Sequence, residues 1–100
     1  MPAKISIDRS ALGGFCRRYQ VRKLSLFGSV LREDFRPDSD VDLLVEFEPG
    51  ARVGLFEMAA MERELGAIVG RKVDLRTPAE LSRYFRDEVV ASAEVQYPAR

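Results

Sequence analysis

The sequence contains no histidine, and this absence removes several kinds of catalytic site. A Ser-His-Asp or Cys-His pair, a histidine metal ligand and a histidine general base are all excluded. Cys16 is the only cysteine, so an internal disulfide and a thiolate metal cluster are excluded as well. Any chemistry must therefore be carried out by carboxylates, hydroxyls, amines or a metal ion that oxygen atoms hold.

A net charge and long apolar runs are also lacking. Lysine plus arginine and aspartate plus glutamate both number 16, so no overall positive field favours nucleic acid or an anionic membrane. No 18 apolar residues follow one another, and residues 1–10 hold no apolar signal segment. We therefore expect a cytoplasmic protein with no membrane contact and no direct nucleic-acid binding. The length of 100 residues predicts one domain, 1–100, with one modest core.

The hydrophobic pattern predicts helices that alternate with short strands. Helical spacing favours helices over residues 7–19, 55–69 and 81–91, with one or two further turns over 30–33. Strands are predicted over 21–27, 41–47, 72–76 and 94–97. The apolar stripe of the helix over 55–69, which starts at Leu55, is expected in the core, as is at least one of Tyr84 and Phe85. This order predicts an α/β (α+β) fold, in which helices flank a small mixed sheet.

Two aspartates, Asp40 and Asp42, flank one valine at the start of the strand over 41–47. Alternate residues of a strand share a face, so both carboxylates point the same way and repel each other unless a cation lies between them. Mg²⁺ suits the position because it prefers oxygen ligands and is typically shared between carboxylates and phosphates. The plainer alternative is a charged pair on the solvent face of an edge strand.

A calcium-binding loop is a second metal hypothesis, since Asp38, Asp40 and Asp42 follow its first three ligand positions. Such a loop needs glycine at its sixth position and glutamate at its twelfth. Those positions hold Leu43 and Pro49. Calcium binding of this kind is therefore excluded.

A candidate phosphate site precedes the two aspartates. Gly28 between a strand and a helix lets the backbone approach a ligand, and Ser29 at a helix N-terminus offers a hydroxyl and amides to an anion. Arg32 lies one turn further on and could reach the same anion. Asp74 lies inside a short apolar strand, where a lone carboxylate is costly unless it is paired or bound to metal. Taken singly, each feature has a structural explanation as a turn, a cap or a solvated charge, but together they describe a Mg-nucleotide site.

The spacing Gly28-Ser29, ten residues, Asp40-x-Asp42 resembles the signature of the minimal nucleotidyltransferases of the DNA polymerase β-like superfamily. The surrounding LFGSVLREDFRPDSDVDLLVEF, the segment at Asp74 and the RDEV stretch over 86–89 are similar to the same family. The resemblance implies a nucleotidyltransferase-like fold, with Asp40, Asp42 and Asp74 as metal ligands. It also implies that Gly28 and Ser29 hold the triphosphate. Many relatives have glycine after the arginine. Here Glu33 follows Arg32 and adds a negative charge near the residues expected to hold the triphosphate.

The implied reaction uses two Mg²⁺ ions and ATP. The ions would hold the α-phosphate, activate an acceptor hydroxyl and stabilise the departing pyrophosphate, and Asp74 would help to deprotonate the acceptor. Members this small resemble antitoxins that transfer AMP to a tyrosine of a HEPN-type ribonuclease toxin. Two alternatives remain: a non-catalytic module that blocks a toxin by contact alone, and a transferase that modifies a small molecule such as an aminoglycoside.

Overall fold

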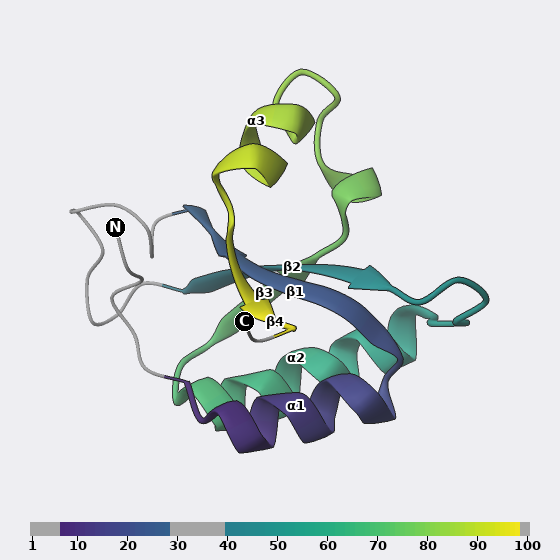
Figure 1. Cartoon of the computed structure of the whole chain (residues 1–100), viewed down its shortest axis with the longest axis vertical. Coiled ribbons are helices and arrows are strands. Elements are labelled where there is room, and N and C mark those ends of the chain that lie inside the picture. Colours follow the sequence, from purple (N-terminus) through teal and green to yellow (C-terminus); the bar gives the residue numbers. More distant parts are fainter. Residues whose placement is uncertain (1–6, 29–39, 99–100) are drawn as a thin grey trace.

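The structure is a computed structural model that describes residues 7–28 and 40–98. In chain order, its elements are α1 (Arg9–Arg18), β1 (Val21–Phe27), β2 (Val41–Phe47), α2 (Leu55–Val69), β3 (Val73–Arg76), the 3-10 helix η2 (Pro78–Glu80), α3 (Arg86–Ser92) and β4 (Glu94–Tyr97) (Figure 1). The strands form one sheet in the order β3-β2-β1-β4. β1 is antiparallel to both β2 and β4, whereas β2 and β3 are parallel. The predicted mixed sheet with flanking helices is confirmed.

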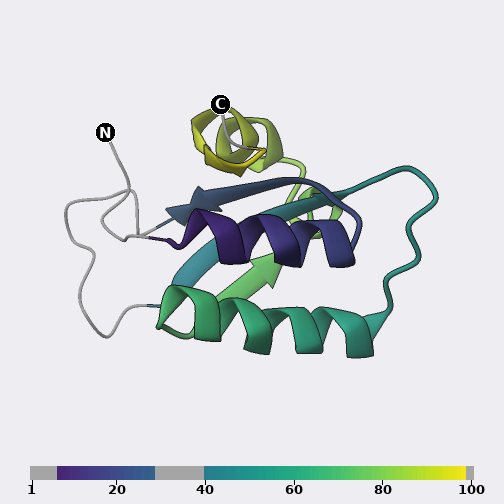
Figure 2. The same ribbon diagram turned by 60° about the horizontal axis from the view of Figure 1, so that its bottom comes forward.

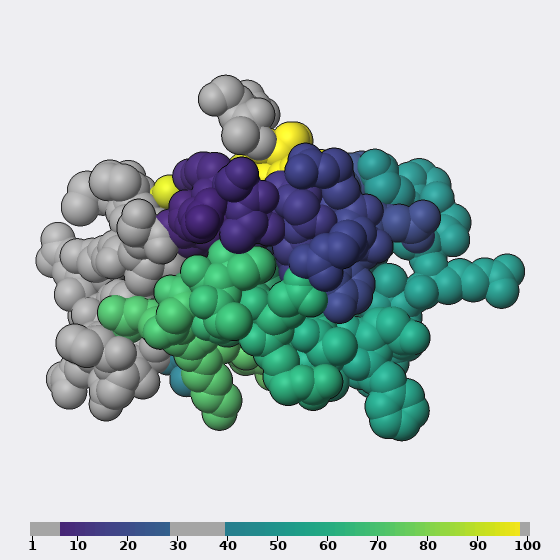
Figure 3. Space-filling view, turned by 90° about the horizontal axis from the view of Figure 1, so that it is seen from below, coloured from purple at the N-terminus to yellow at the C-terminus, as the bar shows by residue number. Residues whose placement is uncertain are grey.

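One face of the sheet is covered by α1 and α2, which run side by side (Figure 2). Viewed from that side, the two helices form a continuous layer over the strands (Figure 3). The core lies between this layer and the sheet. It consists mainly of Leu12, Phe15 and Cys16 of α1, Met61 and Leu65 of α2, and the inward side chains Leu24, Leu26, Val41, Leu43, Val45, Val73 and Leu75.

Asp8 and Gly70 cap the start of α1 and the end of α2. The Asp8 carboxylate accepts hydrogen bonds from the amides of Ser10 and Ala11 at 3.0 and 3.1 Å, which satisfies two free donors at the start of α1. Gly70 ends α2 with a φ of +79°, a left-handed conformation that glycine adopts without strain. The predicted bounds of β1, β2, α2 and β4 are confirmed, and those of α1 and β3 differ by one or two residues at the ends.

The helix predicted over 81–91 is wrong in its first half. A 3-10 turn at Pro78–Glu80 and a loop precede α3, which begins only at Arg86. The Arg86 guanidinium fixes this loop because it donates to the carbonyls of Pro78 and Leu81 at 2.8 and 3.0 Å. Tyr84 is 79% exposed and Phe85 is 61% exposed. The expectation that at least one of them lies in the core is therefore wrong.

Leu55 also departs from the predicted apolar stripe of α2. It lies in the first turn of the helix and is 89% exposed, whereas Met61 and Leu65 are fully buried. The stripe therefore reaches the core only from the second turn onward. The helix predicted over 30–33 lies outside the described residues, as do Ser29 and Arg32. Within residues 7–28 and 40–98, no helix has the length and apolar character needed to cross a membrane.

Candidate active site

The face of the sheet opposite α1 and α2 carries the predicted carboxylates. Val41 and Leu43 belong to the core under the two helices, so strand alternation directs Asp42 to the other face. Asp42 is paired in register with Asp74 on β3 and with Phe27 on β1. Three neighbouring strands therefore bring Asp42, Asp74 and the glycine that follows Phe27 to one place. Asp40 is exposed and immediately precedes β2.

Gly28 is required at its position for two independent reasons. Its φ is +76°, a backbone conformation that side chains other than glycine rarely adopt. A Cβ atom at this position would lie 2.3 Å from Oδ2 of Asp42, well inside contact distance. The sequence predicted a glycine that leaves room for a ligand, and the structure adds that this glycine also leaves room for the Asp42 carboxylate. The phosphate-binding role of Gly28 stays a prediction.

Asp74 is less buried than its sequence context suggested, and it is paired. Its side chain is 38% exposed because β3 is an edge strand of the sheet. Nε of Arg76 lies 3.2 Å from Oδ1 of Asp74, and Nη2 of Arg76 donates to Oδ2 at 3.3 Å. Arg76 played no part in the sequence hypothesis. The signal that could have found it is its spacing of two from Asp74, which puts both side chains on the same face of a strand.

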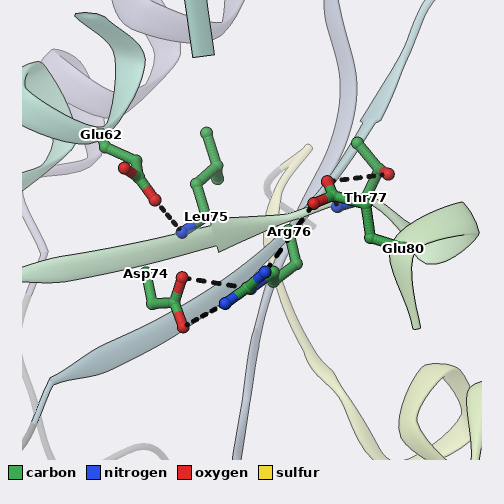
Figure 4. A network of polar contacts seen from close by, with 6 residues as sticks. All are labelled: Glu62, Asp74, Leu75, Arg76, Thr77 and Glu80. Carbon is green, nitrogen blue, oxygen red and sulfur yellow. Dashed lines mark hydrogen bonds and ion pairs between the residues drawn. The ribbon is translucent and has the colours of Figure 1, made fainter. Parts of the chain in front are cut away.

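A set of polar contacts surrounds this pair (Figure 4). Oε1 of Glu80 accepts from the amide and the hydroxyl of Thr77 at 2.9 and 3.1 Å, while Oε2 lies 3.9 Å from Nη1 of Arg76. On the other side of β3, Oε2 of Glu62 accepts from the amide of Leu75 at 2.8 Å. The carboxylate of an α2 residue thereby satisfies a backbone donor of the edge strand.

A pocket of about 640 Å³ opens beside Asp74, between the N-terminal half of α2 and the segment from β3 to η2. Phe47, Met58 and Leu75 contribute apolar walls, and Glu62, Asp74, Arg76 and Glu80 contribute charged groups. Asp74 is one of its lining residues, so the pocket reaches the edge strand that carries this carboxylate. It has room for an aromatic ring or a nucleoside base with polar groups at its edge.

The donor set suits Mg²⁺ in chemistry, although it is not gathered around one point. Within the two described segments, no three aspartate, glutamate, cysteine or histidine side chains are close enough to hold one ion. Mg²⁺ does not need such a cage, since it is usually held by one or two carboxylates, phosphate oxygens and water. Asp42 and Asp74, in register on adjacent strands, match that requirement. Their assignment as metal ligands, with Asp40, stays a prediction.

Cys16 takes no part in this site. It is fully buried in α1, and burial raises the pKa of its thiol from 9.0 to about 12. A thiol with so high a pKa carries almost no thiolate at neutral pH and is a poor nucleophile. Cys16 belongs to the hydrophobic core instead.

Comparison with known proteins identifies a family. The model of the nucleotidyltransferase domain matches residues 9–98. A Methanocaldococcus jannaschii protein, provisionally named protein adenylyltransferase MJ0435, is 30% identical over 76 residues, which are 76% of this chain and 80% of that protein. Protein adenylyltransferase MntA of Thermococcus cleftensis is 41% identical over 58 residues, which are 58% of this chain and 57% of MntA. The chain thus matches less than two thirds of MntA.

Solved structures agree with this result. One provisionally described as a minimal nucleotidyltransferase is 35% identical, with a TM-score of 0.69 and 85% of each chain covered. A toxin-antitoxin structure with AMP-PNP is 17% identical, with a TM-score of 0.71, 94% of this chain and 76% of that chain covered. The Shewanella oneidensis complex of a tri-AMPylated HEPN toxin with its MNT antitoxin has 17% identity and a TM-score of 0.63, and covers 91% of this chain and 70% of that chain. At such identity, the last two show a shared fold.

The family match extends from α1 through β4 and includes the strands that carry Asp42 and Asp74. The chain therefore belongs to the nucleotidyltransferase family and is a nucleotidyltransferase of the minimal type.

Proposed function

We propose that this protein transfers AMP from ATP to a hydroxyl group, that of a tyrosine of a HEPN-type toxin, and thereby acts as its antitoxin. The observation that carries the proposal is the in-register pairing of Asp42 with Asp74 beside Gly28. The names of the relatives support the nature of the transfer, since two of them are called protein adenylyltransferases. The complex of an AMPylated HEPN toxin with an MNT antitoxin, which shares the fold, supports the kind of acceptor.

The site residues fall into two groups in the proposed reaction. Gly28, Ser29 and Arg32 hold the triphosphate, and Asp40, Asp42 and Asp74 hold Mg²⁺. When bound, the metal neutralises charge on the phosphates and polarises the reacting oxygens. The acceptor oxygen forms a bond to the α-phosphorus while the bond from that phosphorus to the bridging oxygen breaks, and pyrophosphate leaves. Asp74 accepts the proton of the acceptor hydroxyl.

The pocket beside Asp74 is the proposed entrance for the acceptor. Apolar walls suit an aromatic ring, and the carboxylate at the edge can accept a hydrogen bond from a phenolic hydroxyl. A second candidate function, stoichiometric binding of a toxin without chemistry, gains support from the exposed apolar side chains Leu55, Phe56, Tyr84 and Phe85. Transfer to a small molecule such as an aminoglycoside is the third.

The mass of the partner distinguishes these functions. We expect a HEPN protein from the same genome to gain one or a few nucleoside monophosphates on incubation with this protein, ATP and Mg²⁺. Asp74→Asn should bind the partner yet leave its mass unchanged. Glu46→Gln is the matched control, because it changes a carboxylate of β2 that is paired with Arg22 and not with the site. Full protection of cells by a triple Asp40, Asp42 and Asp74 variant, with no mass change, would refute the enzymatic proposal in favour of simple binding.

A further inference from the structure

The contact between Arg76 and Asp74 has the form of a side-on fork. The Nε and Nη2 atoms of one guanidinium approach the two oxygens of one carboxylate at 3.2 and 3.3 Å. One hydrogen bond from Nη2 and one ion-pair contact from Nε restrict the orientation of the carboxylate more than a single contact would. A carboxylate has about four acceptor positions, so a fork that uses one on each oxygen leaves the others open.

Arg76 is itself held from the far side. Its Nη1 atom lies 3.9 Å from Oε2 of Glu80, and Glu80 is fixed through its other oxygen by the amide and hydroxyl of Thr77. Thr77, Glu80, Arg76 and Asp74 thus form a continuous series of contacts from the turn after β3 back to the site (Figure 4). The short 3-10 helix η2 provides the fixed end of this series.

From this series we infer that Arg76 is a positioning residue, which holds the Asp74 carboxylate in one orientation toward Asp42. The inference rests on the proposed function, in which Asp74 contacts the metal and the acceptor. Arg76 also supplies a positive charge beside the in-register carboxylates of Asp42 and Asp74. Since both members of the pair are more than a third exposed, the pair contributes little to folding, and its main effect is on orientation.

Kinetics of the transfer reaction test this role. In Arg76→Gln we expect kcat to fall about ten- to a hundredfold, the scale associated with a misplaced catalytic group, while KM for ATP stays within about twofold. Arg76→Lys should restore only part of kcat, because an ammonium provides a point charge and no fork. Arg22→Gln is the matched control: it removes a strand arginine paired with Glu46 at 3.2 Å and should leave kcat unchanged.

Three kinetic results would overturn the inference. These are an unchanged kcat in Arg76→Gln, an equal loss in Arg22→Gln, and a large rise in KM for ATP with kcat preserved. The last would make Arg76 a nucleotide contact. Melting temperatures of all variants close to that of wild type would confirm that the losses do not arise from unfolding.

A second experiment does not depend on the transfer reaction and therefore tests the inference separately from the proposed function. In NMR spectra of the uncomplexed protein, the guanidinium N–H protons of Arg76, whose Nη2 donates to Asp74, should exchange with water more slowly than those of an unpaired arginine. Asp74→Ala should accelerate that exchange at least severalfold, whereas Glu46→Gln should not. Equal exchange in wild type and Asp74→Ala would refute the pairing, even if the transfer reaction is found. Loss of protection in Asp74→Ala would support it, even if no acceptor is modified.

Discussion

Substitution of Gly28 by alanine separates backbone strain from damage to the site. The residue has a φ of +76°, and the added Cβ atom would lie 2.3 Å from Oδ2 of Asp42. Forcing alanine into the left-handed region costs about 1–2 kcal/mol. Moving the Asp42 carboxylate out of its preferred rotamer costs roughly a further 0.5–1.5 kcal/mol. We therefore expect Gly28→Ala to lower the free energy of unfolding by about 1.5–3.5 kcal/mol.

Gly50→Ala is the matched control for this change. Gly50 has a similar φ of +88°, but an added Cβ atom would have no neighbour within 4 Å. It should therefore show the strain alone, about 1–2 kcal/mol, with nucleotide transfer intact in the folded protein. Gly28→Ala should lose transfer by displacing Asp42, at temperatures where both variants are folded. Urea unfolding provides the free energies, and a transfer assay with labelled ATP provides the activity.

The outcome that refutes this reasoning is specific. If Gly28→Ala and Gly50→Ala lose equal stability and both retain transfer, then the Asp42 carboxylate is not confined by the glycine backbone. If Gly28→Ala binds ATP as tightly as wild type but does not transfer AMP, Gly28 acts by leaving room for Asp42 and does not bind the phosphates. That result would correct the sequence prediction for Gly28 while it preserves the one for Asp42.

Three further predictions concern charge and burial. Asp42→Asn should abolish Mg-dependent transfer in a protein that stays folded, because a carboxamide is a weaker ligand for Mg²⁺ than a carboxylate; near-wild-type transfer would contradict the ligand assignment. A hydrogen bond from Arg18 lowers the pKa of Glu64 below its ordinary 4.5. The stability that this exposed pair contributes is therefore present above about pH 4.5 and is lost as the pH falls further. Glu64→Gln should abolish that part of the pH dependence of urea unfolding, and identical pH dependences for wild type and Glu64→Gln would contradict the prediction. Cys16 should not react with a thiol reagent at pH 8 until the protein unfolds, and rapid labelling of the native protein would show that α1 opens readily.

Local structure was predicted well because it depends on neighbours in the sequence. The bounds of β1, β2 and α2 follow from alternation or helical spacing over neighbouring residues. The spacing between Gly28 and the aspartates identified the family before any contact was known. Such features need no knowledge of the rest of the fold.

The wrong predictions share a cause. The spacing of apolar residues does not show whether another part of the fold packs against them. Leu55, Tyr84 and Phe85 have the pattern of buried helix residues, yet all three are exposed. The loop before α3 is fixed by the Arg86 guanidinium on backbone carbonyls, a contact that sequence periodicity does not contain. Burial of an apolar side chain depends on what packs against its element.

The sequence by itself determined that Asp42 points away from the core, because its neighbours Val41 and Leu43 point into it. The family resemblance assigned Asp74 to the same site, but only the tertiary structure shows how it comes to lie beside Asp42, since strand order and register join residues far apart in the chain. In that order β3 is an outer strand, which leaves the Asp74 side chain partly exposed. Alternation along one strand is a local property of the backbone, whereas the choice of neighbouring strand depends on how the whole core packs.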